Sequence, residues 1–152
     1  MLLIIIWVKH NKKLLLLIVF LPNFAFGDMK PLSQIHTSDT SESTVLYILY
    51  RCAALQYGWS GLMNNRKDQG SQNMKKIAEK LALDFQRGAV RFIENKKLDI
   101  SMEQIRENTE LVMNNYDQIW KLNYSKTGQN IGPMTLEDTE ICNQYYSLLS
   151  PE

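Results

Sequence analysis

Histidine is almost missing from this chain of 152 residues, which contains only His10 and His36. Cys–His and Ser–His dyads, the Glu-x-x-His ligands of di-iron bundles and multi-histidine zinc sites all require histidine in the folded core. His10 lies in an N-terminal segment that we expect to be cleaved, and His36 lies in a polar leader. We therefore predict no catalytic residues, no metal site and no cofactor.

The chain also lacks the glycine-rich loops that bind phosphates, since it has neither a Walker loop nor a Gly-x-Gly-x-x-Gly stretch. The stretch GWSG at residues 58–61 does not have the Gly-x-Ser-x-Gly spacing of a nucleophile elbow. Strand signals are missing too, because the sequence has no Asn-Gly turn and no sustained alternation of apolar and polar residues. These absences favour a helical protein without enzymatic activity.

Neither sign of charge dominates the chain. Three of its 17 lysines and arginines fall in the first 27 residues, which leaves 14 basic against 16 acidic residues from Asp28 onward. Proteins that bind nucleic acids normally carry a marked basic surface. We therefore expect no nucleic-acid partner, and instead a partner protein or a component of the cell envelope.

Residues 1–27 have the pattern of a cleaved secretory signal peptide. Two lysines precede an apolar run, and the small residues Ala25 and Gly27 predict cleavage before Asp28. A retained anchor is the alternative, but the run is short for a membrane span and contains a proline. The apolar stretch MLLIIIWV upstream suggests that translation starts near Val8. The mature protein should be secreted or periplasmic and free of the membrane.

After cleavage, we expect two regions. Residues 28–42 are polar and rich in serine and threonine, which predicts a flexible leader. Residues 43–152 should form a single helical domain, because apolar residues recur there at helical spacing in four stretches. These stretches run from Val45 to Met63, from Met74 to Ile93, from Ile105 to Trp120 and from Ile141 to Leu149.

Several residues mark where these helices begin and end. The first helix should start near Ser43, and residues 64–73 should form a polar loop. A capping box of Ser101 and Gln104 begins the third helix, and a weaker one of Thr135 and Asp138 precedes the fourth. The fold class is therefore all-α: an up-down four-helix bundle, or three long helices plus a short C-terminal helix, stapled by one disulfide.

Two further features of these helices bear on packing. The first stretch is long enough to span a membrane, but it holds Arg51 and Gln56, and three other helices could cover it. Gly88 lies on the apolar side of the second helix, which predicts a close helix contact there; a tolerated surface glycine is the alternative.

Cys52 and Cys142 are the only cysteines of the chain, and both lie on apolar stripes. In an up-down bundle the last helix runs antiparallel to the first, so the two residues lie about 14 and about 10 Å from the same end of the bundle. An exported protein also meets an oxidising compartment. We predict a Cys52–Cys142 disulfide. The alternatives are two free buried thiols and a nucleophilic Cys52, which would need an adjacent base.

Arg51 stands beside Cys52 in the middle of an apolar helix, where a charge needs a partner or a path to water. Asp138 precedes Cys142 by one helical turn, so a disulfide would turn both toward the first helix. We predict a structural ion pair between Arg51 and Asp138, with Glu137 as the alternative partner. An Arg51 that extends to solvent is the other possibility.

The functional prediction follows from these absences. We expect a small exported protein without enzymatic activity, which acts as a binding or structural protein of the cell envelope or periplasm. The alternative is a carrier for a small apolar or aromatic ligand in the bundle core, because the chain has many aromatic residues. Most of these aromatics should nevertheless be core residues. The sequon Asn123-Tyr124-Ser125 matters only in a eukaryotic secretory pathway.

Overall fold

The computed structural model describes residues 29–36 and 41–149, so the predicted signal peptide lies outside the described residues. Within those two ranges the chain forms five helices and no strand, which confirms the all-α prediction. The helices are α1 (Leu32–His36), α2 (Glu42–Met63), α3 (Gln69–Lys96), α4 (Met102–Thr127) and α5 (Pro133–Leu149).

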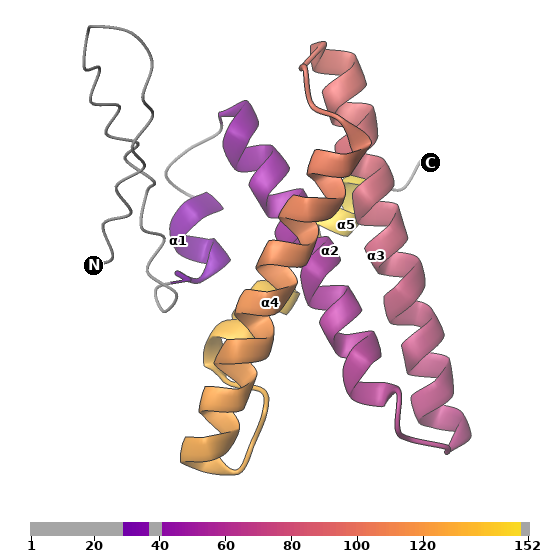
Figure 1. Cartoon of the computed structure of the whole chain (residues 1–152), viewed down its shortest axis with the longest axis vertical. Coiled ribbons are helices and arrows are strands. Elements are labelled where there is room, and N and C mark those ends of the chain that lie inside the picture. The colour runs from indigo at the N-terminus through magenta and orange to yellow at the C-terminus, as the bar shows by residue number, and fades with distance from the viewer. Residues whose placement is uncertain (1–28, 37–40, 150–152) are drawn as a thin grey trace, which may run out of the picture.

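The helices are packed around α2 (Figure 1). α2 and α3 form an antiparallel hairpin, α4 crosses α2, and α5 lies behind that crossing, while α1 lies beside the N-terminal half of α2 (Figure 1). α2 and α4 run in one sense and α3 and α5 in the other, as an up-down bundle requires. α4 is inclined, however, so α3 and α4 both pack on α2 and touch each other little.

The central position of α2 follows from its sequence. A helix that is apolar all round must be covered on every side. Nearly every residue from Leu46 to Gln56 is buried, including Arg51 and Gln56. No helix in the described part of the chain is long and apolar enough to cross a membrane.

Local capping residues set most helix ends. The predicted capping box of Ser101 and Gln104 is present at the start of α4. The predicted start of the first helix near Ser43 is off by little, because Ser41 caps α2. The predicted loop over residues 64–73 is too long, since the Asp68 carboxylate accepts a hydrogen bond from the Ser71 N–H (2.8 Å) and α3 already begins at Gln69.

The predicted capping box of Thr135 and Asp138 is wrong. α5 begins at Pro133, because proline suits the first position of a helix. Thr135 instead accepts a hydrogen bond from the Trp120 indole N–H (Nε1 to Oγ1, 3.0 Å). Asp138 is fully buried inside the bundle.

Two predicted apolar stripes are only partly covered. Met74 and Ile77 of α3 are 57% and 59% exposed, and Leu148 of α5 is 79% exposed. α5 is short and meets α3 near Gly88, where a Cβ atom would lie only 2.9 Å from Leu149 Cδ2. The close contact predicted at Gly88 is thus made by α5. The N-terminal part of α3, which contains Met74 and Ile77, extends past the end of α5 and is not covered by it.

Part of the predicted flexible leader forms a helix. Residues 32–36 form α1, which packs on α2 and α5, and the Leu32 side chain is fully buried. The stretch LSQIH gives little sign of this helix in the sequence, because Leu32 is the one buried side chain among residues 32–35. Residues 37–40 lie outside the described part of the chain.

Candidate functional site

The predicted disulfide is present. Cys52 of α2 and Cys142 of α5 are joined by an S–S bond of 2.03 Å, with their Cα atoms 5.4 Å apart and both residues fully buried. The bond consumes the only two cysteines of the chain. Neither a nucleophilic Cys52 nor a pair of free thiols is compatible with it.

Arg51 is fully buried beside this disulfide and forms the ion pair that its position predicts. Its Nη2 lies 2.5 Å from Asp138 Oδ2, and its Nε donates to the same oxygen at 3.0 Å. Its Nη1 donates to the backbone carbonyl of Lys30 (2.5 Å) and to the Tyr47 hydroxyl (3.3 Å). All three guanidinium nitrogens therefore have acceptors, and Arg51 does not extend to solvent.

Asp138 receives donors from three directions. Besides Arg51, the Tyr116 hydroxyl of α4 donates to Oδ2 at 2.5 Å, and the backbone N–H of Leu32 donates to Oδ1 at 2.7 Å. One carboxylate thus connects α2, α4 and α5 to the segment that begins α1. We call Arg51, Tyr116, Asp138 and the Cys52–Cys142 disulfide the clasp.

Glu137, the alternative partner for Arg51, is used elsewhere. It accepts a hydrogen bond from the Ser33 hydroxyl of α1. The neighbouring carboxylates of Asp138 and Glu137 therefore have different partners. Asp138 binds the buried arginine, and both carboxylates accept a hydrogen bond from α1. Sequence reasoning found Arg51 and Asp138 but missed Tyr116 and α1, since no local pattern connects residues this far apart in the chain.

Electrostatics keep the clasp in one charge state. Burial raises the pKa of the Tyr116 hydroxyl well above its ordinary value, so this group stays protonated and donates to Asp138. Burial alone would lower the pKa of the Arg51 guanidinium, but the neighbouring Tyr116 and Asp138 raise it by more, so Arg51 stays charged. Neither member of such a buried pair can be removed cheaply, because the other charge would stay buried without its partner.

Two hollows lie away from the clasp, around the C-terminal half of α2. The larger, the α3–α4 groove, has a volume of about 750 Å³. It exists because α3 and α4 both pack on α2 but not closely on each other. Its lining combines apolar residues with three carboxylates and one arginine: Tyr57, Ser60, Gly61, Asn64, Glu79, Gln86, Met102, Glu103, Ile105, Arg106, Thr109, Glu110 and Met113.

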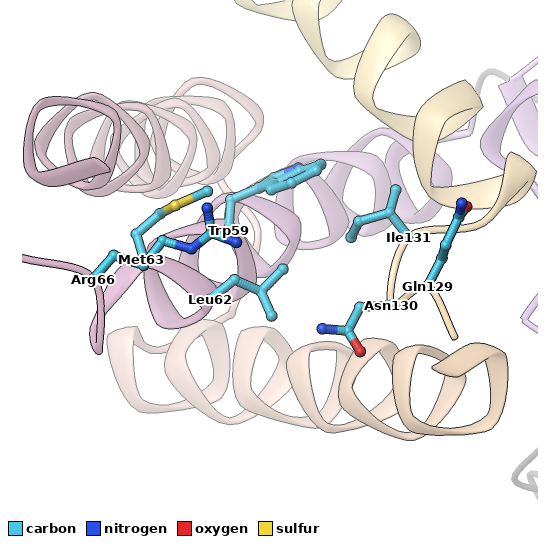
Figure 2. Close-up of a pocket in the computed structure, with 7 residues that line it drawn as sticks. All are labelled: Trp59, Leu62, Met63, Arg66, Gln129, Asn130 and Ile131. Atoms are coloured by element: carbon cyan, nitrogen blue, oxygen red, sulfur yellow. The ribbon is translucent and has the colours of Figure 1, made fainter. Parts of the chain in front are cut away.

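The smaller hollow, the Trp59 pocket, has a volume of about 340 Å³. The end of α2 provides Trp59, Leu62 and Met63, the following loop provides Arg66, and the loop between α4 and α5 provides Gln129, Asn130 and Ile131. In Figure 2, Leu62 and Asn130 approach the space from its two sides, and the Arg66 side chain extends toward Trp59.

A glycine makes the neighbouring packing possible. A Cβ atom at Gly58 would collide with the Trp120 ring, and its distance to Trp120 Cζ3 would be 2.8 Å. The Trp120 ring can therefore pack directly against α2 and lie beside Trp59, with ring centroids 6.1 Å apart. The sequence stretch GWSG thus serves aromatic packing in a helix, as its position predicts, and not a nucleophile elbow.

In the described part of the chain, no group of three histidine, cysteine, aspartate or glutamate side chains is arranged to hold a metal ion. Comparison with the models of known protein families gives no match, and comparisons with curated proteins and with solved structures give none either.

Proposed function

We propose that this chain is a small exported binding protein without enzymatic activity, which takes an amphipathic helix of a partner protein into the α3–α4 groove. The groove supports this proposal most directly, because it is an open, partly apolar channel between two helices. Recognition of a helix in such a groove is a common mode of peptide binding. The clasp, by contrast, is buried and fully partnered.

The groove favours a partner of one chemistry. Its lining on α4 extends from Met102 to Met113, which corresponds to about 16 Å of helix, or about three turns. Methionine side chains adapt to varied apolar partners. Three carboxylates against one arginine give the lining a net negative charge, and that arginine, Arg106, is already paired with Glu103 at 2.5 Å. A helix with an apolar stripe flanked by lysine or arginine complements this surface.

Export rests on two observations. The N-terminal segment has the pattern of a signal peptide, and the buried disulfide suits an oxidising compartment. We expect mass spectrometry of the protein recovered outside the cytoplasm to find a chain that begins at Asp28 and contains no free thiol. A chain that retains residues 1–27, or that carries two free thiols, would contradict export by this route.

The binding proposal can be tested with synthetic peptides. The probe is an α-helical peptide of about three turns with a leucine stripe flanked by lysines, and its counterpart carries glutamates in place of the lysines. We expect the lysine peptide to bind by fluorescence anisotropy and the glutamate peptide to bind at least tenfold more weakly.

A matched pair of variants separates groove binding from general charge attraction. Glu110 lines the groove, whereas Glu107 of the same helix is exposed and does not line it. We expect Glu110→Lys to raise the Kd of the lysine peptide at least fivefold. Glu107→Lys should change that Kd less than twofold. Equal effects of the two substitutions, or no binding of the lysine peptide at all, would overturn the proposal.

A further inference from the structure

We infer that the Trp59 pocket is a second, independent binding site for a small apolar carboxylate, whose body packs against Trp59 and Leu62 and whose carboxylate faces Arg66. This site is separate from the α3–α4 groove and does not depend on the proposed partner helix. The pocket has mainly apolar walls, and Arg66 is the one charged residue in its lining.

The walls and the size of the pocket define the body of the ligand. Trp59, Leu62, Met63 and Ile131 give it a mainly apolar lining (Figure 2). Its volume of about 340 Å³ lies at the small end of the range for ligand sites. At about 30 Å³ for each water-sized group, it holds roughly eleven groups, which is the size of 3-phenylpropionate.

Arg66 defines the charge of the ligand. Among the described residues it has no carboxylate within ion-pair distance, although Asp68 is close enough to feel its charge. The Asp68 carboxylate is committed to the N-cap of α3. The guanidinium reaches toward Trp59 in Figure 2, so an anion in the pocket would gain a charge-assisted hydrogen bond.

Trp59 offers a ligand its apolar ring and not its N–H. The indole Nε1 has no hydrogen-bond partner among the described residues, but it is buried away from the solvent-accessible space of the pocket. Asn130 and Gln129 add amide groups at the opposite side of the pocket.

An apolar carboxylate could be aromatic or aliphatic, and ligand titrations distinguish the two. The probes are 3-phenylpropionate, octanoate and the neutral 3-phenylpropionamide. We expect at least one carboxylate to bind and to shift the side-chain N–H resonance of Trp59 in a heteronuclear NMR spectrum, with the amide at least tenfold weaker. A stronger response to 3-phenylpropionate would identify aromatic acids as the ligands, and a stronger response to octanoate would identify aliphatic acids.

Variants complete the test. Arg66→Gln should raise the Kd of the tighter-binding carboxylate at least tenfold. Arg87→Gln removes an exposed arginine of α3 outside the pocket and should change this Kd less than twofold. Both arginines lie on the surface, so the variants should keep the melting temperature of the parent. Equal binding of carboxylate and amide, equal effects of the two substitutions, or an unmoved Trp59 resonance would overturn the inference.

Discussion

The two halves of α2 differ in what covers them. From Leu46 to Gln56 the helix is surrounded by α1, α3, α4 and α5, and almost every side chain is buried. From Tyr57 to Met63 only Ser60 is buried, and both hollows open there. The covered half contains the clasp, in which charges are partnered within the chain. The open half places polar groups beside apolar surface, where a partner or ligand can reach them.

The disulfide should make the largest single contribution to the covered half. It closes a loop with a sequence separation of 90 residues. Cross-linking a loop of this length stabilises a protein by about 4–5 kcal/mol through the entropy of the unfolded chain. We expect the double variant Cys52→Ala/Cys142→Ala to lose about this much free energy of unfolding in urea denaturation. A loss below about 1 kcal/mol would show that the staple is not a main source of stability.

The Arg51–Asp138 ion pair should make the second-largest contribution to stability. Removal of one member leaves the other charge buried without its partner, which costs about 3–5 kcal/mol. Arg51→Glu and Asp138→Arg should each destabilise by this order, and the double variant should recover part of the loss. Recovery stays partial because the reversed pair would set a carboxylate against the Lys30 carbonyl and a guanidinium against the Leu32 N–H. Strictly additive losses in the urea titrations would refute the pairing.

The stabilisation that Tyr116 provides should be lost at alkaline pH. Its pKa is raised in the folded state by burial, whereas an unfolded tyrosine ionises at about pH 10. Its contribution to stability is therefore complete below about pH 10 and is lost as the pH rises toward the folded-state pKa.

Substitution by phenylalanine isolates this effect. Tyr116→Phe removes hydrogen bonds to two charged groups and should cost about 1.5–3 kcal/mol at neutral pH. It should also reduce the loss of stability between about pH 8 and about pH 10.5, measured as the shift of the urea midpoint. Tyr124→Phe, at an exposed tyrosine outside the clasp, is the control. An alkaline loss in Tyr116→Phe as large as that of the parent would rule out this role.

Two glycines at the start of the open half of α2 should respond differently to substitution by alanine. A Cβ atom at Gly58 would displace the Trp120 ring, whereas a Cβ atom at Gly61 would meet nothing within 4 Å. Gly58→Ala should therefore destabilise by about 1–3 kcal/mol through overpacking. Gly61→Ala should stabilise by about 0.5–1 kcal/mol, because alanine suits a helix better than glycine does. Equal effects of the two substitutions on the melting temperature would contradict this packing.

The sequence was a good guide wherever a feature depended on neighbours along the chain. Helices α2 to α5, the capping box at Ser101 and the buried stripe of α4 all follow from local spacing. The disulfide and the Arg51–Asp138 pair required one tertiary assumption, that the last helix is antiparallel to the first. That assumption sufficed because Asp138 and Cys142 are one helical turn apart.

The features that the sequence did not reveal depend on angles and lengths between helices. The apolar stripe of α3 suggested that Met74 and Ile77 are buried, but α5 is too short to cover them. The inclination of α4, which opens the α3–α4 groove, has no signature in the spacing of α4 itself. α1 was not predicted because a helix of five residues is too short to show a helical period in the sequence.

Native-state hydrogen exchange on the disulfide-bonded protein tests the contrast between the two halves of α2 most directly. If the clasp concentrates stability in the covered half, amides from Leu46 to Gln56 should exchange only by global unfolding. Amides from Tyr57 to Met63 should then exchange through local opening, with protection lower by at least tenfold. Uniform protection along the whole of α2 would contradict the division of this protein into a clasped half and an open, binding half.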